Sequence, residues 1–78
     1  MTIKRKNVTT VAEVHERVEA IRALADDAEA AHAEEDQLHA EVLFAIANLA
    51  RIHGGAWAQE MASAARATYR IEFQRWCA

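Results

Sequence analysis

Apolar residues, interrupted by one polar stretch, recur at alternating spacings of three and four between residues 11 and 53 of this chain. The chain contains no proline, and its only glycines are the adjacent Gly54 and Gly55. A three-four spacing is the period of an α-helix with one apolar face, and a glycine pair is a strong signal that a helix ends. The sequence therefore predicts an all-α protein with helices on both sides of these glycines.

The region before the glycines predicts two helices. The first covers residues 10–25, because Thr10 followed by Glu13 has the spacing of a capping box. The second covers residues 27–52 after a break at Asp26, since aspartate suits a helix N-terminus. The two helices would form an antiparallel hairpin. The spacing also allows one continuous helix across the same region, which is the alternative to the hairpin.

A third helix is predicted at residues 56–68, followed by an aromatic tail. We expect Trp57 to lie in the core or to anchor an interface. Phe73 and Trp76 are three residues apart, so one turn of the tail could bury both rings against the hairpin. These three aromatic residues are the predicted anchors of the tail or of an interface.

The chain has 78 residues, more than half of them apolar, but alanine dominates that share. A chain of this length can bury little surface alone. We therefore expect a single helical domain at residues 10–78 that forms a homo-oligomer, most simply a homodimer, preceded by a flexible basic arm at residues 1–9.

Charge is distributed unevenly along the chain. Residues 4–6, 13–41 and 51–78 carry net charges of +3, −8 and +2. An acidic middle argues against a nucleic-acid groove, so only weak nucleic-acid binding is considered, through the basic arm. No apolar run is long enough to span a membrane. The single cysteine, Cys77, and the lack of a signal peptide predict a cytoplasmic protein.

Four ionisable residues of the second helix fall on one stripe: His32, Glu35, Asp36 and His39. The stripe continues into the apolar Leu43 and Ile46, so we expect it to face the core. Buried ionisable groups must be paired or must bind something. The leading interpretation is a structural polar network with arginines from the first helix and from the tail. Its predicted members are Arg22, His32, Glu35, Asp36, His39 and Arg75.

The alternative for the same stripe is a divalent-metal site. The spacing Glu29-x-x-His32 matches the Glu-x-x-His element of di-iron helical bundles, and histidine and carboxylate are common metal ligands. A metal there would suit a phosphate-ester or nucleotide hydrolase. The alternative ligands are Glu29, His32, Glu35, Asp36 and His39. In the leading interpretation the chain has no cofactor and no catalytic residue.

Two motifs also carry a resemblance to a protein family. The A-H-x-x-E-D stretch at residues 31–36 and the F-x-R-W-C-A ending at residues 73–78 resemble small helical proteins encoded by bacteriophages and prophages. The resemblance implies an origin in a phage or mobile element, and no particular activity. Together these observations favour an accessory protein that acts by binding a host or phage protein.

Overall fold

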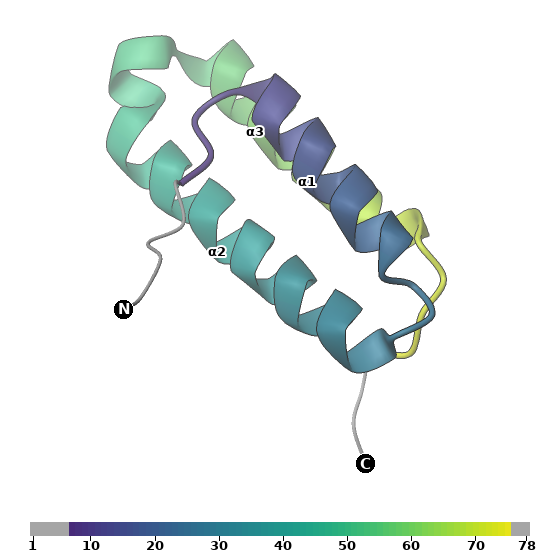
Figure 1. The fold of residues 1–78 in the computed structure, drawn as a ribbon. Helices are drawn as coiled ribbons and strands as arrows, with labels where there is room; N and C mark the ends of the chain where they lie inside the picture. Colours follow the sequence, from purple (N-terminus) through teal and green to yellow (C-terminus); the bar gives the residue numbers. More distant parts are fainter. Residues whose placement is uncertain (1–6, 76–78) are drawn as a thin grey trace.

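The computed structural model describes residues 7–75, which form three α-helices and no strand (Figure 1). The prediction of an all-α hairpin followed by a third helix is confirmed, and the alternative of one continuous helix is wrong. Dimerisation stays a prediction. The elements are α1 (Val11–Ala23), α2 (Ala28–His53), α3 (Gly55–Arg66) and a short 3-10 helix, η1 (Ala67–Arg70).

The N-terminus of α1 is fixed by the capping box that the sequence predicts. The Glu13 backbone N–H donates to the Thr10 hydroxyl oxygen at 3.1 Å, and the Thr10 backbone N–H donates to the Glu13 carboxylate at 3.1 Å. These bonds satisfy donors that have no partner within the helix.

The break between α1 and α2 is a short turn at residues 24–27. Asp27 is the N-cap of α2, where its side chain accepts from the Ala30 backbone N–H at 3.1 Å. This cap lies one residue later than the predicted break at Asp26. At the other end of α2, Gly54 has a φ of 93°, a conformation that residues with a Cβ rarely adopt. The glycine pair therefore reverses the chain between α2 and α3.

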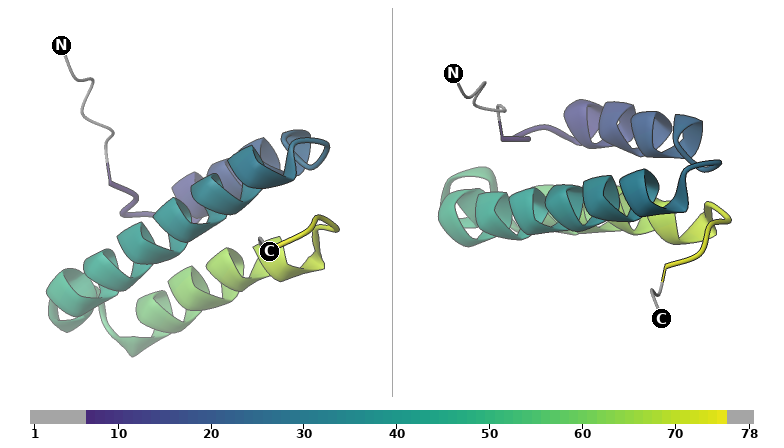
Figure 2. Two further views of the ribbon diagram at one scale, coloured as in Figure 1. Left: turned by 90° about the horizontal axis from the view of Figure 1, so that it is seen from below. Right: turned by 60° about the horizontal axis from the view of Figure 1, so that its bottom comes forward.

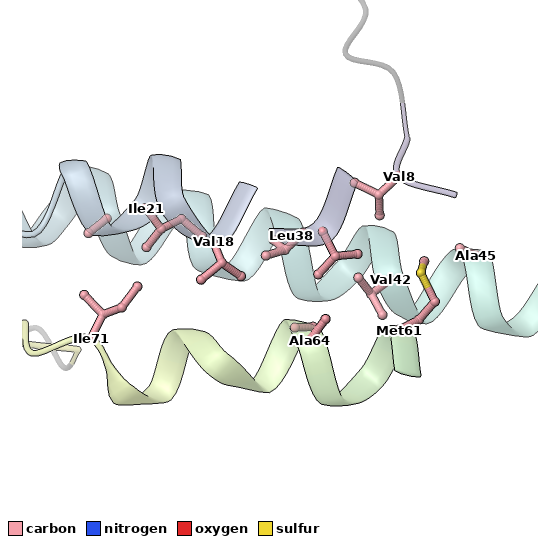
Figure 3. Packing of buried hydrophobic residues seen from close by; sticks show 12 residues of the cluster. Val8, Val18, Ile21, Leu38, Val42, Ala45, Met61, Ala64 and Ile71 are labelled. Carbon is pink, nitrogen blue, oxygen red and sulfur yellow. The ribbon is translucent and has the colours of Figure 1, made fainter. Parts of the chain in front are cut away.

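The three helices pack pairwise against one another. α2 runs antiparallel to α1 and to α3, and both shorter helices lie along it (Figures 1 and 2). Figure 3 shows the side chains that meet between them. The core consists of Val8, Val14, Val18, Ile21, Ala31, Leu38, Val42, Ala45, Met61, Ala64, Ala65 and Ile71.

Val8 corrects the predicted boundary of the N-terminal arm. It was assigned to a flexible arm at residues 1–9, yet its side chain is buried in the core. Removing an apolar side chain from water is favourable. Val8 therefore contributes to the core although it precedes the capping box. Residues 1–6 lie outside the described part.

The buried face of α2 is also rotated from the predicted stripe. Its centre runs through Leu38 and Val42, which are buried, whereas Leu43 is 69 % exposed. The rotation places Leu38, which is fully buried, at the centre of the core. The predicted polar stripe therefore lies partly at the edge of the core.

Candidate functional site

Glu35 and Arg75 form an ion pair between α2 and the tail. The Glu35 side chain is only 3 % exposed. Arg75 donates from Nε to Oε1 at 3.0 Å and from Nη2 to Oε2 at 3.1 Å. Two parallel N–H···O bonds between a guanidinium and a carboxylate are the strongest geometry for such a pair. The contact fixes the tail against the N-terminal half of α2.

Arg75 also closes the end of η1. Its Nη2 atom donates to the carbonyl oxygens of Thr68 at 2.6 Å and Ile71 at 3.1 Å. The guanidinium carbon lies 4.0 Å from the centroid of the Phe73 ring, within cation–π distance. One arginine therefore satisfies carbonyls at a helix end, covers an aromatic ring and neutralises a buried carboxylate.

Two opposing effects act on the Glu35 carboxyl. Burial raises its pKa, but the hydrogen bonds and the charge of Arg75 lower it, and the net result lies below the ordinary value. Glu35 is therefore ionised at neutral pH. Both of its oxygens accept bonds from Arg75, which stabilises the ionised form against protonation.

His39 lies one turn after Glu35 and contacts the end of α3. Its Nε2 atom is 3.0 Å from the Thr68 hydroxyl oxygen and 3.1 Å from the Ala65 carbonyl oxygen. A carbonyl oxygen can only accept, so this geometry places the imidazole proton on Nε2. The His39 ring also meets the Tyr69 ring edge-on, at 5.2 Å between centroids. His39 thus joins the buried ion pair to the surface of the molecule.

The other predicted members of the network lie outside it. Arg22 pairs with Glu19 of its own helix at 3.3 Å, and both side chains are more than half exposed. His32 lies 3.5 Å from Asp36, which is 72 % exposed. The rotation of α2 explains this difference, because it turns Asp36 toward solvent and His32 to the edge of the core. The structure brings together only Glu35, His39 and Arg75.

The alternative metal ligands are dispersed in the same way. Glu29 and Asp36 are exposed, and the Glu35 oxygens are occupied by Arg75. Within residues 7–75, no three His, Cys, Asp or Glu side chains are placed to hold a metal ion. Metal binding by the stripe of Glu29, His32, Glu35, Asp36 and His39 stays a prediction.

A second buried carboxylate, Glu41, was not predicted from the sequence. Arg17 of α1 donates to it from Nη1 at 2.8 Å and from Nη2 at 3.2 Å, and the Gln37 amide donates at 2.8 Å. The Val8 backbone N–H adds a fourth bond at 3.3 Å. Burial raises the pKa of the Glu41 carboxyl, but these partners lower it below its ordinary value. The signal for this site was the position of Glu41 one turn after Leu38, on the apolar face.

A shallow apolar groove of about 210 Å³ lies beside His39, between α2 and α3. Leu43 and Tyr69 border it and are 69 % and 59 % exposed. Tyr69 and Arg66 also line an adjoining, more polar hollow together with Arg70. The groove is lined by His39, Val42, Leu43, Ile46, Ala62, Ala65, Arg66 and Tyr69.

The predicted aromatic anchors have separate positions. Trp57 is partly buried against the core, and its Nε1 atom donates to the Thr9 carbonyl oxygen at 3.2 Å. Phe73 is partly buried against the same core. Trp76 and Cys77 lie outside the described residues, as do the three cations of the basic arm, Lys4, Arg5 and Lys6.

Comparisons with protein-family models, with curated proteins and with solved structures found no match to this chain. Among the described residues, no helix is long and apolar enough to cross a membrane. The site consists of two carboxylates engaged by arginines inside the fold, and an apolar groove with a basic border outside it.

Proposed function

We propose that this protein acts by binding another protein at the groove between α2 and α3. The observation that carries the proposal is the exposure of Leu43 and Tyr69 on the two borders of the groove. Large apolar side chains that border a concave surface are typical of binding sites for other proteins. By contrast, the two buried carboxylates, Glu35 and Glu41, are engaged in holding the helices and the tail together.

The charge around the groove defines the chemistry of the partner. Arg66 lines the groove, and Arg70 lies in the adjoining hollow. Both side chains are exposed, and neither forms an ion pair with a carboxylate among the described residues. A partner segment with a large apolar side chain next to an aspartate or glutamate would fill the groove and pair with Arg66.

The setting of this interaction rests on the resemblance to phage and prophage proteins. On this basis we propose that the protein acts in the cytoplasm of a bacterial host, with a host or phage protein as its partner, and that the interaction requires no cofactor. The alternative, a metal-dependent hydrolase, has no observation in its favour beyond the residue types of the stripe.

Selection from a random peptide library on the immobilised full-length protein tests the proposal. We expect enrichment of peptides that combine a large apolar residue with a neighbouring acidic residue. Arg66→Glu should shift the selection toward basic peptides, because it reverses the charge at the border. Tyr69→Ala should weaken the binding of the peptides that the wild type selects.

The matched control is Arg22→Glu on α1, which makes the same charge change away from the groove. It should leave the selected sequences unchanged. Circular dichroism of all variants establishes that they are folded. The proposal is overturned if the wild type enriches no peptide, or if the enriched peptides bind Arg66→Glu and Tyr69→Ala as well as they bind the wild type.

A further inference from the structure

The outer face of α2 carries large apolar side chains that nothing within residues 7–75 covers. Leu43 is 69 % exposed and Phe44 is 59 % exposed. Ala40 and Ala47 are exposed one turn before and one turn after them. In the left view of Figure 2, α2 lies in front of α1.

Charges of opposite sign flank this apolar centre. Asp36 lies one turn before Ala40, and Arg51 lies one turn after Ala47, and both are exposed. The residues of this face are, in order, Asp36, Ala40, Leu43, Phe44, Ala47 and Arg51. The spacings between successive residues of this set are four, three, one, three and four. The pattern is therefore symmetric about its midpoint in position and in apolar character, while the charges at its two ends are opposite.

A symmetric dimer requires a surface that is complementary to itself. If two copies of α2 pack antiparallel about this midpoint, Leu43 faces Phe44 of the other copy, and Ala40 faces Ala47. Asp36 then faces Arg51 at both ends of the contact. A parallel arrangement would instead place Asp36 against Asp36 and Arg51 against Arg51.

We propose that this face binds a second copy of the chain, as an antiparallel α2–α2 dimer with Leu43 and Phe44 at its centre. The alanines on either side let the two helices approach closely, which increases the contact between side chains. The contact from Asp36 to Arg51 is about 22 Å long at a rise of 1.5 Å per residue. This is a small interface, so the dimer dissociates on dilution.

The dimer surface and the groove share only Leu43. Phe44 belongs to the dimer surface and does not line the groove, whereas Tyr69 lines the groove and lies on η1. Because Leu43 belongs to both surfaces, a dimer would cover one border of the groove, and the two proposals compete for this side chain. Phe44→Glu and Tyr69→Ala separate the two surfaces in experiments.

Sedimentation equilibrium of the full-length chain across a wide concentration range is the first test. The monomer mass is 8.7 kDa, and we expect the apparent mass to approach twice that value as concentration rises. Phe44→Glu should remain monomeric while keeping its helical circular dichroism, because an exposed residue is replaced. A wild-type chain that stays monomeric at every concentration overturns the proposal, as does a dimer that Phe44→Glu leaves intact.

Charge reversal then tests the antiparallel register. Asp36→Arg and Arg51→Asp should each weaken the dimer about tenfold, because each replaces two attractive pairs with two repulsive ones. The double variant should recover wild-type affinity, and an equimolar mixture of the single variants should form a heterodimer. Glu16→Arg, the same change at an exposed position of α1, should have no effect. Single reversals that leave the affinity unchanged overturn the antiparallel register.

Discussion

Two buried glutamates in α2 are neutralised in different ways. Glu41 accepts from Arg17, Gln37 and the Val8 backbone, all of which precede it in the chain. Glu35 receives its strong bonds from one residue, Arg75, which is forty positions away. Both carboxylates are 3 % exposed. The two carboxylates are therefore equally buried, but only Glu35 depends on a single cation for its strong hydrogen bonds.

This difference shows how the two ends of the chain are attached to the helices. At Glu41 the attachment is distributed over three donors, so losing one leaves two. At Glu35 it is concentrated in Arg75, which also bonds the carbonyls of Thr68 and Ile71. We expect the tail to be the part of the fold most sensitive to a single substitution.

Arg75→Ala should give the largest effect. It leaves the Glu35 carboxylate buried without its cation, which typically costs about 3–5 kcal/mol, and it removes donors from two carbonyls. Urea denaturation followed by circular dichroism measures the loss in the free energy of unfolding. Arg70→Ala, an exposed arginine of η1, is the control and should change stability by less than about 0.5 kcal/mol. If Arg75→Ala lowers the free energy of unfolding by less than Arg17→Ala does, Glu35 is not the carboxylate that depends more on a single partner.

Arg17→Ala should cost less, about 1–3 kcal/mol, because Gln37 and the Val8 backbone N–H still donate to Glu41. Removing Gln37 as well sharpens the comparison. In the Arg17→Ala background, Gln37→Ala should cost more than it does in the wild type, since it takes away one of the two remaining donors. Additive losses, measured by the same urea denaturation, would mean that the donors at Glu41 act independently.

The sequence predicted the pair of Glu35 and Arg75 but not the pair of Glu41 and Arg17, because the two pairs have different neighbours in the sequence. Glu35 falls among other ionisable residues, and the compact F-x-R-W ending made Arg75 conspicuous. Glu41 and Arg17 each lie beside an apolar stripe, next to Val42 and Val18, where a charged side chain is normally solvated. Their pairing depends on the packing angle between α1 and α2, which no spacing within one helix determines.

The helices themselves were largely predictable from local signals. The capping box at Thr10 and the glycines after α2 act within a few residues, so their effects can be recognised in the sequence. The rotation of α2 was not predictable in this way. It depends on which of several apolar side chains fills the space between the three helices: Leu38 does so, whereas Leu43 is exposed.

Acid should destabilise both sites. The pKa values of Glu35 and Glu41 are lower in the folded protein than their ordinary value of 4.5. The stability they contribute is therefore present above that value and is lost as pH falls through the lower folded values. Thermal melting between neutral and acidic pH measures this loss. Glu35→Gln and Glu41→Gln should each reduce the pH dependence, and a slope that neither variant changes would assign acid unfolding to other carboxyls, such as Glu13.

The smallest effect is expected at His32. The sequence places it in the buried network, but its contact with Asp36 lies at the surface, where ion pairs contribute about 0–1 kcal/mol. His32→Ala should therefore barely change the melting temperature. His39→Ala should lower it clearly, because the imidazole contacts Ala65 and Thr68 at the end of α3.

The same two variants decide the metal alternative. A metal that binds only the folded chain stabilises it by an amount that grows with the logarithm of the metal concentration above the dissociation constant. With the contacts of Glu35 and His39 intact, zinc, manganese and magnesium should leave the melting temperature of the wild type unchanged. If one of them raises it by several degrees, and His32→Ala and His39→Ala both abolish the increase, the two imidazoles are metal ligands. The edge of α2 would then be a binding site that opens when a metal displaces the hydrogen bonds of His39.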